Sequence, residues 1–142
     1  MLRMLIAVDG SDPSLRAIEV VARLVPKTFG LEAVLLNVRP GPAYFGELPP
    51  FDHASIERAQ QQIQDVMLGD ALAHARRSGL VHVTSVALVG EVSGEIVRYA
   101  SHGTFDQIVL GTHGRGPVGS LFLGSVAQRV VHLSSVPVLL VR

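Results

Sequence analysis

Glycine residues are concentrated in the segment 111–125, which carries the residues best suited to hold an anionic ligand. Glycine amides approach a phosphate closely, and the unpaired N–H groups at the start of a helix attract negative charge. Arg115 adds a fixed positive charge and Ser125 adds a hydroxyl donor, while no Asp or Glu occurs between Gln107 and Arg142. The segment therefore predicts a phosphate-binding loop. Glycines that serve only tight turns are the alternative.

Two common phosphate-binding motifs match this segment only in part. Gly114, Gly116 and Gly119 have the spacing of the dinucleotide fingerprint. That fingerprint follows a first strand and has an acidic residue about 20 positions later, which this chain lacks. Gly119 and Gly124 have the spacing of a P-loop, but Ser125 stands where the P-loop lysine is required. Neither motif explains the segment.

Asp9 is the other candidate for ligand chemistry, because it follows the first apolar run of the chain. We interpret it either as a ligand-binding carboxylate or, together with Ser11, as a cap of the helix that follows. His113 lies in the glycine segment and is interpreted either as a phosphate contact or as an exposed turn residue. The histidines lack the spacing of zinc sites, and the chain lacks the serine elbow of hydrolases.

Alternating strands and helices must position these residues. Stretches rich in Val, Leu and Ile predict five strands, at residues 2–8, 33–38, 82–88, 106–111 and 136–141. Most lack polar alternation, as in a parallel sheet that is covered on both faces. Apolar residues at helical spacing predict helices from Ser11 or Asp12 to Val25 and at residues 54–78, 93–101 and 118–133. This order predicts a doubly wound α/β fold.

Two segments between the strands carry more specific expectations. The longest helix is expected to end at Gly79 and to place its apolar residues on one side. These residues are Ile56, Ile63, Val66, Met67 and Ala71.

Residues 39–52 are rich in proline and glycine and are expected to form an irregular loop, which is either a lid, a partner surface or a plain connector.

Composition limits the function classes. A length of 142 residues predicts one domain, residues 1–142, that can bury a core without metals or disulfides. Zero net charge argues against a nucleic-acid partner. The longest apolar run, residues 4–8, is too short for a membrane helix or a signal peptide. Cysteine is absent, which removes thiolate chemistry. We therefore expect a cytoplasmic protein without a membrane partner.

A third glycine pattern fits at every fixed position. Gly111, two residues, Gly114, nine residues and then Gly124 and Ser125 match the Gly-x2-Gly-x9-Gly-Ser/Thr motif. With this motif the chain resembles the ATP-binding branch of the universal stress protein family, from residues 6–11 at its start to residues 136–141 at its end. The resemblance implies a three-layer, Rossmann-like fold of the adenine nucleotide α-hydrolase type. Its five parallel strands would have the order 3-2-1-4-5.

The resemblance also implies roles for single residues. Asp9 would lie near the ribose and a bound magnesium ion, and the backbone at Val38 would read the adenine. Gly114, Arg115, Gly124 and Ser125 would hold the phosphates. The full set implied to bind the nucleotide is Ala7, Val8, Asp9, Val38, Gly111, Thr112, Gly114, Arg115, Gly116, Gly124, Ser125 and Val126.

By this resemblance the chain is an ATP-binding sensor or switch, and ADP, AMP or cyclic AMP could also fit. Because no general base is evident near the terminal phosphate, at most slow ATP hydrolysis is expected. Two alternatives are a ligand-free interaction module of the same family and an enzyme of adenylyl transfer or ATP-pyrophosphate cleavage. The resemblance further implies a homodimer through the last strand, residues 136–141, and an unknown downstream protein. The alternative to the homodimer is a monomer whose last strand is shielded by its own fourth helix.

Overall fold

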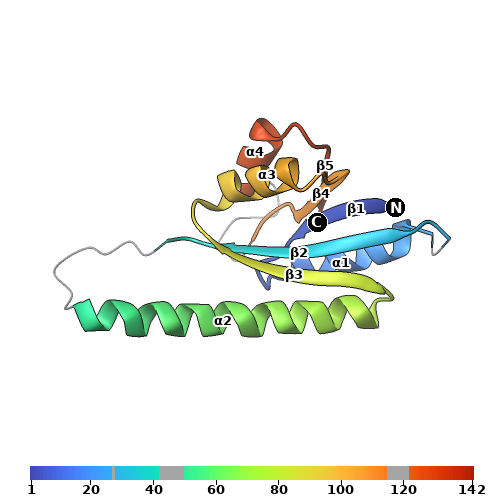
Figure 1. Ribbon diagram of the computed structural model, residues 1–142. Coiled ribbons are helices and arrows are strands. Elements are labelled where there is room, and N and C mark those ends of the chain that lie inside the picture. The colour runs from blue at the N-terminus through green and yellow to red at the C-terminus, as the bar shows by residue number, and fades with distance from the viewer. Residues whose placement is uncertain (27, 42–49, 115–121) are drawn as a thin grey trace.

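The five strands form one parallel sheet in the order β3-β2-β1-β4-β5 (Figure 1). The computed structural model describes residues 1–26, 28–41, 50–114 and 122–142. Its elements are β1 (Leu2–Ala7), α1 (Asp12–Leu24), β2 (Leu31–Arg39), α2 (Pro50–Arg77), β3 (His82–Val89), α3 (Val92–His102), β4 (Gln107–Gly111), α4 (Ser125–Leu133) and β5 (Val138–Val141). The predicted α/β class and strand order are confirmed.

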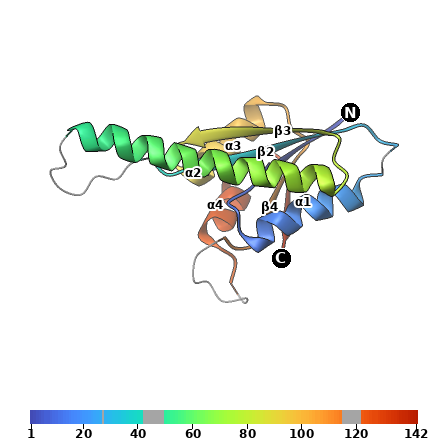
Figure 2. The ribbon, with the colours of Figure 1, turned by 90° about the horizontal axis from the view of Figure 1, so that it is seen from below.

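Helices cover both faces of the sheet, with α1 and α2 on one face and α3 and α4 on the other (Figures 1 and 2). Successive strand residues point to opposite faces. In β1, Ile6 therefore packs into the cluster under α1 and α2, and Leu5 packs into the cluster under α3 and α4. Both side chains are fully buried. Two buried faces explain why the strand sequences lack polar alternation.

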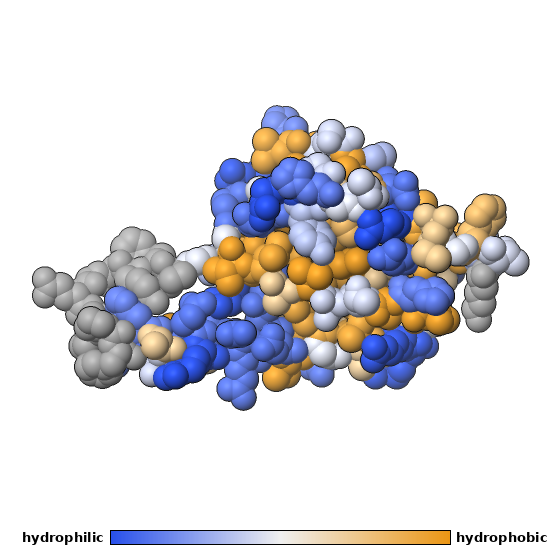
Figure 3. All heavy atoms as spheres, in the orientation of Figure 1, coloured by the Kyte–Doolittle hydropathy of each residue, from blue (hydrophilic) through white to orange (hydrophobic). Residues whose placement is uncertain are grey.

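Side chains link several elements at the amino ends of the strands. The Arg3 guanidinium of β1 bonds to Glu32 of β2 at 3.1 Å and donates to the Gly103 carbonyl after α3. It also lies 4.7 Å from the centre of the Phe105 ring. In Figure 3, hydrophobic residues lie where Figure 1 shows β2 and β3, between the more hydrophilic surface of α2 and the α3 layer.

The carboxyl ends of β1 and β4 lie side by side, because these strands pair in register from Met4 and Gln107 onward. α1 begins directly after β1, with Ser11 as its N-cap. The Ser11 side chain accepts a hydrogen bond from Ser14 N at 3.4 Å, as the capping rule expects. The chain therefore brings Asp9 next to the turn that follows β4.

α4 is shorter than predicted, and the expected start at residue 118 is wrong. The helix begins at Ser125, and Gly124 is its N-cap with an extended backbone (φ −61°, ψ 157°). Gly124 N donates to the Thr112 carbonyl at 2.6 Å, which ties the chain to the end of β4 immediately before the first helical turn. Residues 115–121 lie outside the described part of the chain.

α2 is longer than predicted, because it begins at Pro50 and not at residue 54. Residues 50–52 are therefore helical, although we expected them in a loop. Proline is well tolerated in the first helical turn, where its missing N–H would have no partner. At the other end of the expected loop, Arg39 still belongs to β2, and only residues 40 and 41 are described as irregular. Residues 42–49 lie outside the described residues. Among the described helices, none has the length and apolar character needed to cross a membrane.

The buried face of α2 also differs from the prediction. Between residues 52 and 77, its buried residues are Gln64, Leu68, Ala71 and Ala75. Ile63 and Val66, which we expected on one side of the helix together with Ala71, are 68% and 59% exposed, whereas Ala71 is buried. Both line a groove of about 1080 Å³ between α2 and the start of α1. The prediction treated the apolar residues of the helix as one face, but Ile63 and Val66 face the groove, while Leu68 and Ala71 pack toward the sheet.

Candidate functional site

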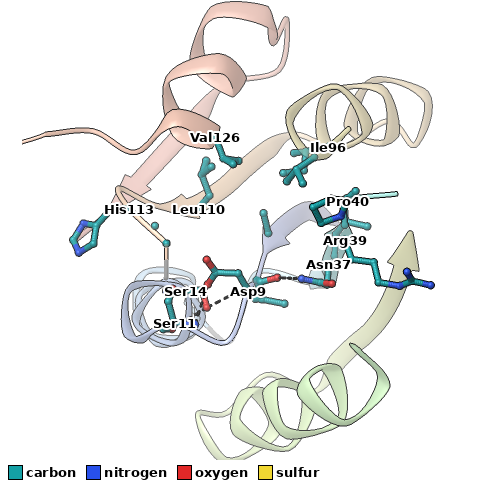
Figure 4. A pocket seen from close by; sticks show the side chains of 17 residues that line it. Asp9, Ser11, Ser14, Asn37, Arg39, Pro40, Ile96, Leu110, His113 and Val126 are labelled. Carbon is teal, nitrogen blue, oxygen red and sulfur yellow. Dashed lines mark hydrogen bonds between the residues drawn. The ribbon is translucent and has the colours of Figure 1, made fainter. Parts of the chain in front are cut away.

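A cavity of about 340 Å³ lies at the carboxyl ends of β1, β2 and β4 (Figure 4). In a doubly wound sheet this is the place where the strand order reverses and where ligands bind. Of the predicted site residues, the cavity is lined by Ala7, Val8, Asp9, Val38, Gly111, Gly114 and Val126. Thr112, Gly124 and Ser125 are described but are not part of this lining, and Arg115 and Gly116 lie outside the described residues.

One end of the cavity is apolar. Ile96 of α3, Leu110 of β4 and Val126 of α4 surround it in Figure 4. The strand residues Leu36 and Val38 also line the cavity. These side chains come from the α3 and α4 face of the sheet. A flat, uncharged ring system fits such a surface, because pockets of this kind are mostly apolar with few polar groups. Sequence reasoning missed Ile96 as a lining residue, since it reads as an ordinary core position of a helix.

The Asp9 carboxylate uses its two oxygens differently. Oδ1 accepts a hydrogen bond from Ser11 N at 2.9 Å, and Asp9 N lies 3.4 Å from the Ser14 hydroxyl. Oδ2 faces Gly114, at the place where a side chain on that residue would begin. The carboxylate thus supports the start of α1 with one oxygen and borders the cavity with the other. Both interpretations from the sequence, cap and ligand group, are compatible with this arrangement.

Three glycines of the motif are required by close packing within the protein. A Cβ atom at Gly111 would lie 2.7 Å from Pro13 Cβ, and one at Gly124 would lie 3.1 Å from His113 Cα. A Cβ at Gly114 would collide with the Asp9 carboxylate. These three glycines do not have positive φ angles. They therefore serve close approach of chain segments. Gly111 and Gly114 line the cavity, whereas the Gly124 amide is already used, since it donates to the Thr112 carbonyl.

Backbone hydrogen bonds hold the turn after β4. Thr112 N donates to the Val141 carbonyl of β5 at 2.8 Å, and the Thr112 carbonyl accepts from Gly124 N. The Thr112 hydroxyl lies 3.1 Å from His113 Nδ1, and the His113 ring points away from the cavity in Figure 4. Ser125 is exposed in the first turn of α4. Thr112 thus joins the cavity wall to both β5 and the start of α4.

A second set of polar residues, which the sequence analysis did not identify, lies at the carboxyl end of β2. Asn37 and Arg39 line the cavity, and both bond to Gln64 of α2. The Arg39 side chain turns away from the cavity in Figure 4 and bonds to Glu57, which lowers the pKa of that carboxyl group. Asn37 was detectable as a polar residue inside an apolar run. Gln64 gave no signal, because it stands among other glutamines.

This arrangement can bind a ligand that has an apolar, a polar and an anionic part. Within the described residues, no group of three or more His, Asp or Glu side chains could hold a metal ion without help from a ligand. The backbone amides in the first turn of α4 suit an anion.

Comparison with known proteins gives one consistent family. The model of the universal stress protein family matches residues 1–142. A universal stress protein of Thermus aquaticus, from the 3′ region of a QAH/OAS sulfhydrylase gene, is 36% identical over 140 residues, which cover 98% of this chain and 97% of the relative. YxiE of Bacillus subtilis, also a universal stress protein, is 29% identical and is covered to 98%.

Solved structures agree in fold. UspA of Lactobacillus plantarum superposes with a TM-score of 0.80 at 21% identity and covers 99% of this chain and 97% of its own. A universal stress protein of Archaeoglobus fulgidus in complex with dAMP gives 0.69 at 23% identity, covering 100% and 98%. A family member from Arabidopsis thaliana with AMP bound gives 0.70 at 18% identity, covering 99% and 91%.

Proposed function

Since the chain belongs to the universal stress protein family, we propose that it is a sensor or switch that binds ATP, ADP or AMP at the cavity between β1 and β4. The observation that carries this proposal is the cavity itself, in which an apolar end, the Asp9 carboxylate and the Gly114 backbone meet. The complexes of related proteins with dAMP and AMP support an adenine nucleotide as the ligand class.

Each part of a nucleotide has a place in this proposal. The adenine packs between Val38, Ile96 and Val126, where the backbone at Val38 reads its edge. Asp9 Oδ2 accepts a hydrogen bond from a ribose hydroxyl. The phosphates extend toward Gly114 and toward the start of α4, where the amides that follow Gly124 in the first helical turn have no partner within the helix and the helix dipole favours negative charge. Gly124 and Ser125 belong to this start, and Arg115 and Gly116 complete the proposed phosphate site.

Magnesium fits the same arrangement only as a metal shared with the nucleotide. Mg²⁺ is usually held by one or two carboxylates together with substrate phosphates. Asp9 Oδ2 is one such carboxylate oxygen, since Oδ1 already accepts from Ser11. Bound magnesium would neutralise phosphate charge, and Asp9 would hold the ion in place.

The proposal also includes a biological setting. We propose a cytoplasmic homodimer, joined through β5, that signals to a downstream protein and hydrolyses ATP slowly at most. With zero net charge, the chain offers no general attraction for nucleic acid.

Calorimetry with ATP, ADP and AMP tests the proposal, together with identification of any nucleotide released when the purified protein is denatured. Gly114→Ala places a methyl group against Asp9 Oδ2, so we expect the affinity to fall at least tenfold, about 1.4 kcal/mol. The matched control is Gly69→Ala in α2, where an added Cβ meets no atom within 4 Å. The control should bind normally and be more stable by about 0.5–1 kcal/mol. Normal binding by a folded Gly114→Ala protein would contradict the proposed site.

A further inference from the structure

A chain of hydrogen bonds links α2 to the end of β1. Gln64 is only 5% exposed, although it stands on a helix whose neighbouring glutamines are exposed. Its Nε2, which carries two N–H groups, has three acceptors within hydrogen-bond distance: Asn37 Oδ1 at 2.8 Å, Leu88 O at 3.0 Å and Asn37 O at 3.1 Å. Its Oε1 accepts from Arg39 Nε at 3.1 Å. Every polar atom of the Gln64 side chain is therefore paired, and its amide has one orientation.

Asn37 connects Gln64 to the cavity wall through a second hydrogen bond. Its Nδ2 donates to the Val8 carbonyl at 2.7 Å, a bond that Figure 4 shows next to Asp9. β1 ends at Ala7, so the Val8 carbonyl lies beyond the strand and receives its hydrogen bond from a side chain. The same peptide group contains the nitrogen of Asp9. Fixing the Val8 carbonyl therefore fixes the plane from which the Asp9 side chain departs.

The two ends of the Asn37 amide are not equivalent. Only the oxygen can accept from Gln64, and only the nitrogen can donate to the Val8 carbonyl. Gln64 thus selects the rotamer of Asn37 that serves Val8. A residue without donors at position 64 would leave Asn37 Oδ1 in a part-buried position without this partner and would free the Asn37 amide to turn.

We propose that Gln64 is a positioning residue for nucleotide recognition. Acting through Asn37 and the Val8 carbonyl, it holds Asp9 with Oδ2 toward Gly114 and so sets how strongly the site prefers a ribose hydroxyl. This inference rests on the proposed function, in which Asp9 Oδ2 accepts from the ribose. Gln64 itself contacts no part of the nucleotide in this proposal.

The test is the ratio of dissociation constants for ATP and its 2′-deoxy and 3′-deoxy analogues, measured by calorimetry. We expect the wild-type protein to prefer ATP at least tenfold over one of the analogues. In Gln64→Met, which keeps the length of the side chain and removes its donors, this preference should fall to twofold or less. The control is Gln61→Leu, which removes an exposed glutamine of the same helix and should leave the ratio unchanged.

The ratio separates positioning from stability. If Gln64 were only structural, Gln64→Met would lower the melting temperature and weaken all three nucleotides equally, and an unchanged ratio would overturn the inference. A wild-type protein that binds all three equally would also overturn it, while the proposed function would stand. A wild-type protein that binds none of them would end the proposed function itself.

A second variant and a second measurement cover a Gln64→Met protein that does not fold. Gln64→Glu keeps the shape and the acceptor for Arg39 but loses the Nε2 donors, so it should lose the preference as well. In the protein without nucleotide, Ser11 N–H is bonded to Asp9 Oδ1, and its hydrogen exchange reports on that carboxylate. Exchange should become faster in Gln64→Glu and not in Gln61→Leu. Unchanged exchange together with an unchanged ratio would contradict the role of Gln64.

Discussion

Asp9 shows how one carboxylate serves a helix and a cavity together. Its Oδ1 holds Ser11 N at the start of α1, and its Oδ2 borders Gly114. An alanine substitution would remove both interactions, so a fall in stability and a fall in affinity could not be assigned separately. Asparagine is the better replacement, because its side-chain oxygen can still accept from Ser11.

Asp9→Asn is expected to change the free energy of unfolding by no more than about 0.5 kcal/mol, as surface substitutions usually do. It should weaken Mg-ATP binding at least tenfold, because it removes the negative charge and the second acceptor oxygen. The loss should be larger with magnesium than without it. Calorimetry with and without magnesium, together with thermal unfolding of the same variant, measures both effects. Unchanged affinity combined with lower stability would reduce Asp9 to a helix cap.

Among single residues, the sequence predicted those site residues that can be recognised from their position next to a strand or within a motif. Asp9 and the glycines could be identified from their order and spacing, and the structure brings Asp9, Gly111 and Gly114 to one cavity. Gln64 could not be identified, because its role depends on which turn of α2 lies over the end of β2. That placement is a long-range property of packing.

α2 illustrates the same limit at the scale of one element. Its apolar residues occupy more than one face, so periodicity alone did not identify the face that meets the sheet. Leu68 and Ala71 lie against the sheet, whereas Ile63 and Val66 line the groove beside α1. The neighbouring helix decides which stripe is buried. The existence of α2 was therefore predictable and its orientation was not.

Paired substitutions in α2 test this orientation. Leu68→Ala should lower the free energy of unfolding by about 2–4 kcal/mol, because it empties a site that is 4% exposed. Ile63→Ala should change it by less than about 0.5 kcal/mol, since that side chain is 68% exposed. Urea denaturation of both variants gives the two values. Equal losses would mean that Ile63 is buried in solution.

Among whole-molecule features, β5 is an edge strand whose side chains are already partly used. Leu139 packs with the α1 and α2 layer, while Val138 and Leu140 pack with the α3 and α4 layer. Ile108 N donates to the Pro137 carbonyl and Thr112 N to the Val141 carbonyl. Backbone groups alternate in direction along a strand, so those of Val138 and Leu140 point away from β4. An exposed edge of this kind can pair with a second copy.

We expect a homodimer through β5 at tens of micromolar protein. Leu140→Pro removes an N–H from the free edge without touching the bonds to β4, and proline is tolerated on edge strands. Light scattering should give twice the chain mass for the wild-type protein and a mass near 15.2 kDa for the variant. A wild-type mass near 15.2 kDa would exclude this dimer. Thermal unfolding of the variant checks that the monomer is folded.

Because all strands are parallel, residues 2 and 141 lie at opposite ends of the sheet, and this determines where a purification tag or a fluorescent label can be attached. Leu2 bonds to Gly30 at the amino edge of the sheet, where Arg3 links β1 to β2 and to the segment after α3. Val141 pairs with Gly111, a cavity residue, at the carboxyl ends of the strands. A peptide added before residue 1 therefore leaves the molecule away from the cavity, whereas one added after residue 142 starts on the side of the sheet where the cavity lies. Binding experiments and distance measurements by fluorescence transfer call for amino-terminal fusions.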